Sequence, residues 1–269
     1  MKQFSFFRIN RTRTSGMIRT DQIAEFLPSR INPVDGYEED ICIYNKMQPP
    51  ENFPPLAYYD INDLFPFAPW ILDHPRIKVI TMSRIQHDYV SYVLNRDDIV
   101  LIPQHHCNYL RESRDRNGVK VVGLIGGNRS YELDRSKLQN MFDHIGMEYI
   151  ECIKPPNRQT VVDFYKQIDI QITFRPNRSL SKEIGKLGTS LKVVNAGSFG
   201  IPTVAFPEPT YVDEFDGCFL PAYSEEELIK EVKRLKNDPV LYNELSERLK
   251  SKTEKYHIEH IIELYKQLS

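Results

Sequence analysis

The chain has 269 residues with a formal net charge of −2, and 41% of the residues are hydrophobic. This length is enough for one large or two small domains with real cores, and the near-neutral charge provides no global field that would favour nucleic acid. The sequence predicts no membrane span, since no apolar run approaches the required length, and no secretory signal, since polar and basic residues occur throughout Met1 to Asn10. The four cysteines lie far apart in sequence, which excludes metal or redox spacing and predicts a cytoplasmic protein.

The first part of the chain alternates strand-like and helix-like segments. A strand is predicted over Lys2–Ile9, and a helix over Ser15–Leu27. Three further strands are predicted over Asp40–Asn45, Arg76–Met82 and Asp98–Pro103. The Pro- and aromatic-rich stretch Gln48–Trp70 is predicted to be a loop with a short helix.

A polar linker is predicted over Arg111–Gly118, and the alternation is cleaner after it. The predicted strands are Val119–Ile125, Glu148–Ile153, Ile168–Phe174 and Pro202–Phe206. The predicted helices are Asp134–Ile145, Thr160–Gln167 and one that carries Lys192. In the tail, Ser224 with Glu227 and Asp238 with Pro239 indicate helix starts.

Short apolar strands separated by helices indicate an α/β protein whose parallel sheets are covered on both faces. Two such sets joined by a linker predict two Rossmann-like lobes around a cleft. We expect an N-terminal lobe over residues 1–115 and a C-terminal lobe over residues 116–254. A C-terminal helix over residues 255–269 could pack back on the N-terminal lobe.

Ligands of open parallel sheets bind beyond the carboxyl ends of the strands, which directs attention to the loops that follow them. After the first strand come Gly16 and three arginines, Arg11, Arg13 and Arg19. Five basic and no acidic residues lie among the first twenty, so an anion-facing loop and an ordinary charged loop are both open. A basic surface of this kind is also the one feature that would support peripheral membrane contact.

Paired histidines follow the last strand of the N-terminal lobe. A histidine there could donate hydrogen bonds or act as a general base. Adjacent residues on an extended strand point in opposite directions, so one of His105 and His106 is expected to face the cleft, and His106 is the candidate.

Two strand ends of the C-terminal lobe carry phosphate-binding candidates. Gly126, Gly127 and Arg129 follow its first strand, but they form neither a Gly-x-Gly-x-x-Gly nor a Walker motif, which argues against a nicotinamide enzyme and a phosphate-loop kinase. Arg175 leaves a buried strand and could hold phosphate bidentately.

The segment from Thr189 to Glu214 is the most informative part of the sequence. A helix start with Lys192 offers backbone N–H groups and a fixed cation, which suits a diphosphate. Asn195 lies three residues later on nearly the same face and could bind a ribose. Glu208 follows the next strand, where its carboxylate could accept hydroxyl hydrogens from a ribose or sugar.

This segment resembles the donor-binding segment of GT-B-type glycosyltransferases, and more closely that of a bacterial, retaining, group 1-like subgroup. That subgroup has Lys-Leu-x-Asn-Ala, Gly-Val-Pro and Pro-Glu-x-x-Tyr, and an Arg-Pro after an earlier strand. The residues that match are Arg175, Lys192, Asn195, Ala196, Gly200, Pro202, Pro207, Glu208 and Tyr211.

The resemblance implies a hexosyl- or pentosyltransferase that uses a nucleotide-diphosphate sugar as donor substrate and no separate cofactor. Lys192 and Arg175 would stabilise the leaving diphosphate, and His106 with the N-terminal arginines would serve a glycan or lipid-linked glycan acceptor. No Asp-x-Asp motif occurs, so we expect no metal requirement. Two alternatives stay open: a glycosyltransferase that acts on modified DNA bases, and a non-catalytic nucleotide-sugar-binding protein.

Overall fold

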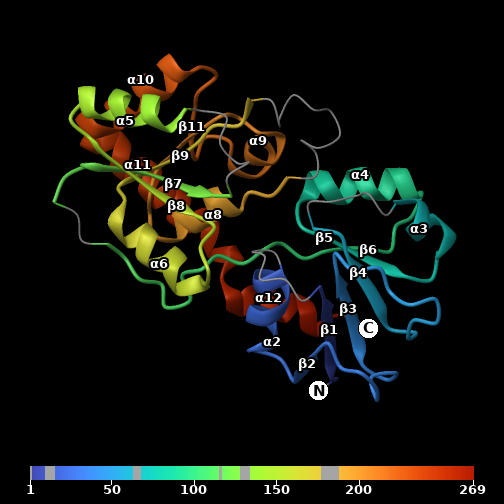
Figure 1. Cartoon of the computed structure of the whole chain (residues 1–269). Helices are drawn as coiled ribbons and strands as arrows, with labels where there is room; N and C mark the ends of the chain where they lie inside the picture. Colours follow the sequence, from blue (N-terminus) through green and yellow to red (C-terminus); the bar gives the residue numbers. More distant parts are fainter. Residues whose placement is uncertain (1, 10–15, 63–67, 115–116, 128–133, 177–187) are drawn as a thin grey trace. The chain divides into compact units, whose positions relative to one another are not determined.

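The computed structural model describes residues 2–9, 16–62, 68–114, 117–127, 134–176 and 188–269 (Figure 1). The chain divides into two compact units. Unit 1 contains Met1–His105, Ile258–Ser269 and a few residues that precede helix α8, and unit 2 contains His106–Gly185 and Ser190–His257. Each unit has one parallel sheet with helices, which confirms the predicted α/β class with two Rossmann-like sets of strands.

The sheet of unit 1 has six strands in the order β2-β1-β3-β4-β5-β6. They are β1 (Phe4–Arg8), β2 (Ser29–Ile31), β3 (Ile41–Asn45), β4 (Ala57–Asp60), β5 (Lys78–Thr81) and β6 (Ile99–Leu101). Its helices are η1 (Met17–Asp21), α2 (Gln22–Ala24), α3 (Ala68–Asp73), α4 (Arg84–Leu94) and the C-terminal α12 (Ile258–Lys266).

Side chains on β1 show that both faces of this sheet are covered. Phe6 meets Tyr265 of α12 edge to face, with ring centroids 6.2 Å apart. Its neighbour Phe7 points to the opposite face, where it stacks on Tyr44 of β3 at 4.5 Å and belongs to a buried cluster that includes Val90 of α4. Because the C-terminal helix supplies one of these covers, the last residues of the chain are part of the core of unit 1.

The sheet of unit 2 has five strands in the order β11-β10-β9-β7-β8. They are β7 (Val121–Gly126), β8 (Glu148–Ile153), β9 (Ile170–Thr173), β10 (Thr203–Ala205) and β11 (Leu220–Pro221). The helices are α5 (Arg135–His144), α6 (Arg158–Gln167), α8 (Leu191–Ser198), α9 (Pro209–Phe215), α10 (Glu225–Asn237), α11 (Pro239–Thr253) and the short η4 (Glu254–Tyr256).

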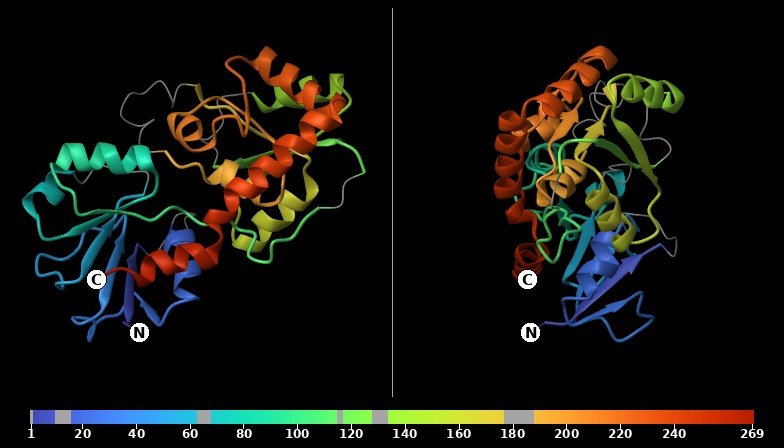
Figure 2. Two further views of the ribbon diagram at one scale, coloured as in Figure 1. Left: turned by 180° about the vertical axis from the view of Figure 1, so that it is seen from behind. Right: turned by 90° about the vertical axis from the view of Figure 1, so that its left-hand side faces the viewer.

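Helix α8 is packed closely against α11, and Figure 2 shows the two helices from behind. A Cβ atom on Gly197 would lie 2.6 Å from Cγ2 of Thr253, so only glycine fits this crossing without a shift. Gly200 follows α8 with a φ of 65°, a left-handed conformation that favours glycine. The Gly-Ser-Phe-Gly run after Lys192 is therefore explained by packing and turning.

The predicted helix starts in the tail are confirmed by their capping contacts. The Ser224 hydroxyl accepts from the backbone N–H of Glu227 at the start of α10. The Asp238 carboxylate accepts from the N–H of Leu241 at the start of α11, whose first residue is Pro239.

One prediction about local structure in unit 1 is wrong, and a second is confirmed only in part. The stretch predicted as loop between Gln48 and Trp70 contains β4, whose four residues are all buried, because the aromatic pair Tyr58 and Tyr59 packs into the core. The helix predicted over 15–27 is present but shorter: it is a π-helix followed by one short α-helical turn that ends at Ala24, and Ser15 lies outside the described residues.

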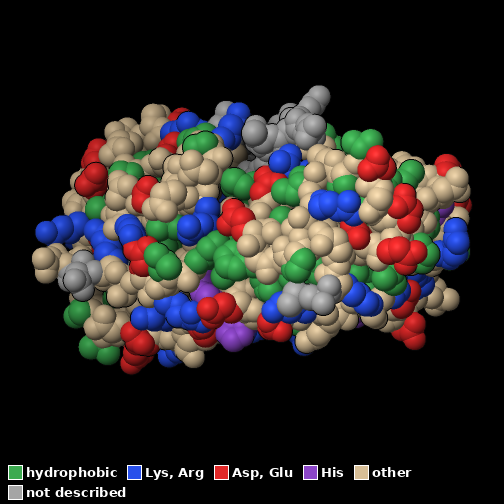
Figure 3. All heavy atoms as spheres, turned by 90° about the horizontal axis from the view of Figure 1, so that it is seen from below, with side chains coloured by type: hydrophobic (Ala, Val, Ile, Leu, Met, Phe, Trp, Pro, Cys, Tyr) green, Lys and Arg blue, Asp and Glu red, His purple; other side chains and the backbone are tan. Residues whose placement is uncertain are grey.

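Basic and acidic side chains are interspersed on the face seen in Figure 3, in agreement with the near-neutral composition. No helix within the described ranges is long and apolar enough to cross a membrane. Among the same residues, no group of three His, Cys, Asp or Glu side chains is arranged to hold a metal ion.

Candidate functional site

The strand order of unit 2 places a topological switch point between β7 and β9. From β7 the chain passes to β8 on one side and then to β9 on the other. Ligands of doubly wound sheets bind outside the carboxyl ends of the strands at such a point. Gly126 and Gly127 end β7, and Phe174 and Arg175 follow β9, so two of the sequence-predicted loops meet at this position.

Gly126 has a φ of 152°, a value that residues with a Cβ atom seldom adopt. Its carbonyl accepts from the N–H of Lys154 beyond β8, at 2.9 Å, which fixes the turn. A glycine backbone held in this way lets a ligand approach the chain closely. Arg129, the third candidate of this loop, lies outside the described residues.

Helix α8 begins at the same edge of the sheet, because it connects the carboxyl end of β9 to the amino end of β10. Lys192 is half-buried in its first turn. Among the described residues, the N-cap Ser190 makes no side-chain capping bond; its hydroxyl donates to the carbonyl of Thr210 instead, at 3.2 Å. The first turn thus combines a helix-dipole positive end with a lysine.

Arg175 and Glu208 form a buried bidentate ion pair at this edge. Nε of Arg175 donates to Oε1 of Glu208, and Nη2 donates to Oε2, both at 2.6 Å. Nη2 also donates to the hydroxyl of Tyr211 at 3.2 Å. The exposed fractions of the two charged side chains are 8% and 5%. The sequence predicted both residues as ligand contacts, but it did not predict that they bind each other.

The environment keeps Arg175 charged. Burial acts to lower the pKa of its guanidinium, but attraction to Tyr211 and Glu208 and their hydrogen bonds outweigh burial and raise the pKa above its ordinary value. A fixed cation therefore lies where the strand order predicts a ligand.

Asn195 lies in a buried hydrogen-bond network. Its Oδ1 accepts from the backbone N–H of Cys107 at 2.8 Å, and its side chain is hydrogen-bonded to Tyr165. The Tyr165 hydroxyl in turn donates to Oε1 of Gln171 at 2.6 Å. The side-chain oxygen of Asn195 thus has a partner within unit 2.

The histidine prediction is corrected by the structure. The side chains of His105 and His106 are both buried, each with 2% of its surface exposed. A ring nitrogen of His105 lies 3.1 Å from the carbonyl of Ile18. His106 packs against His257 with ring centroids 5.3 Å apart, and its backbone N–H donates to the backbone carbonyl of Tyr256. Neither imidazole is exposed, as the predicted role toward an acceptor would require.

The acceptor assignment of Arg19 is also corrected. Arg19 is 1% exposed, and its Nε donates to Oδ2 of Asp60 at 2.8 Å. Its Nη1 donates to the carbonyls of Ile102 and Pro103. It therefore belongs to the core of unit 1.

The remaining residues of the predicted acceptor loop are described only in part. Gly16 precedes η1 with an ordinary φ of −63°, so its conformation does not demand glycine. Arg11 and Arg13 lie outside the described residues, and their role stays a prediction.

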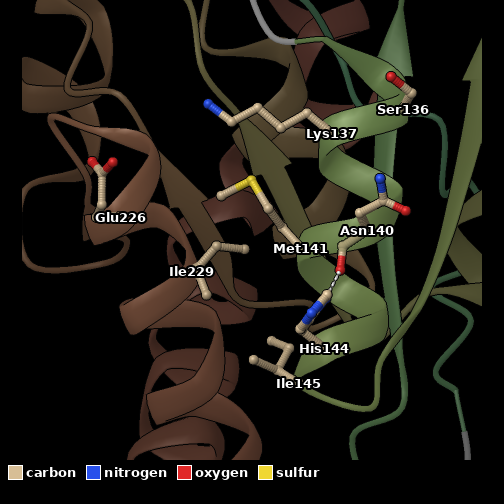
Figure 4. Close-up of a pocket in the computed structure, with 8 residues that line it drawn as sticks. All are labelled: Ser136, Lys137, Asn140, Met141, His144, Ile145, Glu226 and Ile229. Carbon is tan, nitrogen blue, oxygen red and sulfur yellow. Dashed lines mark hydrogen bonds between the residues drawn. The ribbon is translucent and has the colours of Figure 1, made fainter.

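Unit 2 also has an open groove of about 620 Å³ between α5 and α10 (Figure 4). Met141 and Ile229 point into it, with Lys137 and Glu226 at its edges. None of the sequence-predicted site residues line it.

In comparisons of the sequence, no protein-family model and no curated protein matches the chain. The structure, however, is similar to that of WaaG, a glycosyltransferase involved in lipopolysaccharide biosynthesis (TM-score 0.56, 10% identity, 98% of both chains covered). It is also similar to Anabaena HepE in complex with UDP-glucose (TM-score 0.63, 9% identity, covering 100% of this chain and 99% of HepE).

A third similar structure is TarM, with a TM-score of 0.59 and 14% identity over 86% of this chain. The chain spans only 55% of the length of TarM. A variant of S. aureus TarM was solved with fondaparinux, α-GlcNAc-glycerol and UDP. At identities this low, the structural similarity shows the fold alone, and the fold is that of GT-B glycosyltransferases.

Proposed function

We propose that the chain is a glycosyltransferase that moves a sugar from a nucleotide-diphosphate sugar to an acceptor. The observation that carries the proposal is the strand order of unit 2, in which the Gly126-Gly127 turn and Arg175 follow the two strands at the switch point and the helix with Lys192 starts at the same edge of the sheet. The fold adds support, because HepE and TarM share it and were solved with UDP-glucose and with UDP, respectively.

In this proposal, catalysis depends on stabilising the negative charge of the leaving diphosphate. Breaking the bond between the anomeric carbon and the diphosphate leaves negative charge on the phosphate oxygens. Lys192, the positive end of the α8 dipole and Arg175 would stabilise that charge more strongly in the transition state than in the bound donor. The glycine turn at 126–127 would let the nucleotide approach the backbone. No metal enters this proposal, and unchanged activity in a chelator is the expected result.

For the acceptor we propose a glycan or lipid-linked glycan, with retention of configuration. Support comes from the sequence resemblance and from the ligands of the TarM variant, which include fondaparinux and α-GlcNAc-glycerol. Arg11 and Arg13 are the remaining sequence candidates for an anionic acceptor. Asn195 and Glu208 are not assigned to the ribose, because their side-chain oxygens already accept hydrogen bonds within unit 2.

The test is turnover. The purified chain is incubated with UDP-, GDP-, ADP- and dTDP-sugars, with and without glycan acceptors, and release of the nucleoside diphosphate is measured. We expect release from one donor class, and loss of release in Lys192→Ala. Tight binding of a nucleotide sugar without turnover would support the non-catalytic binding protein instead, a reading favoured by the burial of His106 and Arg19.

A further inference from the structure

Glu208 lies at the start of a helix, where an acidic side chain normally forms hydrogen bonds with the backbone of that helix. It is the N-cap residue of α9, and Pro209 follows as the first helical residue. An N-cap carboxylate usually accepts from the N–H groups of the first turn and is favoured by the helix dipole. Within the described residues, the Glu208 side chain makes no such bond, and both of its oxygens face Arg175.

This arrangement orients Arg175. The Glu208 carboxylate covers the Nε and Nη2 edge of the guanidinium, and the Tyr211 hydroxyl accepts a second hydrogen from Nη2. Paired hydrogen bonds of this kind fix the plane of a guanidinium as well as its position. The plane and the position of the guanidinium are then set before a phosphate arrives.

We infer that Glu208, together with Tyr211, is a positioning residue that aims Arg175 at the diphosphate, and that it does not itself contact the nucleoside. The inference rests on the proposed function. It replaces the sequence-based assignment of Glu208 to a ribose or sugar hydroxyl. It also connects the Pro-Glu-x-x-Tyr segment to the Arg-Pro segment through one shared guanidinium.

Alternatively, Glu208 could compete with the diphosphate for Arg175. A carboxylate that neutralises Arg175 could be displaced by the incoming diphosphate, so that Glu208 would weaken donor binding. Three roles of Glu208 therefore predict different effects of the same substitution on two ligands, UDP and uridine, which differ only in the diphosphate.

The experiment measures UDP binding by calorimetry and uridine binding by ligand-observed NMR, for the wild type, Glu208→Gln, Arg175→Met and the double variant. We expect Glu208→Gln to weaken UDP binding by about tenfold and to leave uridine binding unchanged. The double variant should bind UDP no more weakly than Arg175→Met alone, because both changes remove the same interaction. If the cognate base is not uracil, the matching diphosphate and nucleoside are used.

Equal losses for UDP and uridine in Glu208→Gln would mean that Glu208 contacts the nucleoside, and tighter UDP binding would mean that it competes; either result overturns the inference. If Glu208→Gln does not fold, Tyr211→Phe provides the same test, since it should weaken UDP binding about threefold and spare uridine. Unchanged UDP binding in a folded Tyr211→Phe protein would also overturn it. If the wild type binds none of UDP, ADP, GDP or dTDP, the proposed function itself fails.

Discussion

Each unit buries one arginine against one carboxylate near the carboxyl ends of its strands, yet the two pairs differ in geometry. Arg175 in unit 2 makes two hydrogen bonds to Glu208 and a third to Tyr211. Arg19 in unit 1 donates to Asp60 through Nε alone, and its Nη1 donates to the carbonyls of Ile102 and Pro103. In the described part of the chain, Nη2 of Arg19 and Oδ1 of Asp60 have no hydrogen-bond partner.

The difference separates a structural arginine from a site arginine. Arg19 ties the end of β6 to β4 and lies over the ring of Tyr265 at 5.8 Å, so several segments depend on it. Arg175 is held by two residues of one short segment beside the proposed phosphate site. A buried cation is therefore not evidence of a ligand until its partners are known.

The largest expected effect is on the stability of unit 1. Arg19→Met should lower the free energy of unfolding by about 3–5 kcal/mol, because it leaves the Asp60 carboxylate buried without its main partner. Urea unfolding followed by circular dichroism checks this. A loss below 1 kcal/mol would show that Arg19 does not hold unit 1 together.

The next effect is on activity. Lys192→Ala should remove roughly 2–4 kcal/mol of transition-state stabilisation, seen as a fall in kcat/KM, while the unfolding midpoint stays unchanged. Lys137→Ala is the matched control, since Lys137 also lies near a helix start of unit 2, pairs with Glu225 on α10 and lines the groove that contains none of the sequence-predicted site residues. Equal activity losses in both variants would remove the special role of Lys192.

Arg175→Met should lower the free energy of unfolding by roughly 1–3 kcal/mol, which is less than the loss expected for Arg19→Met. Glu208 is an N-cap residue, so its released carboxylate can turn to the first N–H groups of α9, whereas Asp60 retains only a 3.3 Å bond from Nδ2 of Asn45. The same unfolding assay compares the two variants. Equal destabilisation would contradict the distinction drawn between the pairs.

The smallest effects concern the two tyrosines. Tyr211→Phe should cost about 1 kcal/mol, because it removes a hydrogen bond to a charged group. Tyr265→Phe should leave the stability unchanged or raise it, since the Tyr265 hydroxyl is buried and, among the described residues, unbonded. Thermal unfolding of the two variants measures the difference, and a reversed order would show that the assigned contacts are wrong.

Strand and helix positions in unit 2 were predictable because their signals are local. The apolar runs of β7, β8 and β9, the caps at Ser224 and Asp238, and the lysine at the start of α8 can all be recognised within a few residues of sequence. The switch point between β7 and β9 then follows from the strand order, which the alternation of elements suggests but does not determine.

The errors share a cause, which is that burial depends on distant partners. The side chain of Asn195 accepts a hydrogen bond from the backbone N–H of Cys107, which is 88 residues away in sequence. Arg19 appeared to belong to a basic surface because its partner Asp60 ends β4, the strand that Pro54 and Pro55 concealed within a predicted loop. Recognising β4 would have supplied a buried acid and made a buried Arg19 a reasonable expectation.

The central claim is that the edge of unit 2 formed by Gly126, Arg175 and the start of α8 holds a nucleoside diphosphate. Calorimetric titration of UDP, ADP, GDP and dTDP into the wild type, Lys192→Ala and Lys137→Ala tests it most directly. The account predicts saturable binding of one diphosphate to the wild type and to Lys137→Ala, and binding at least tenfold weaker to a folded Lys192→Ala protein. Binding of equal strength to all three proteins, or to none of them, would contradict it.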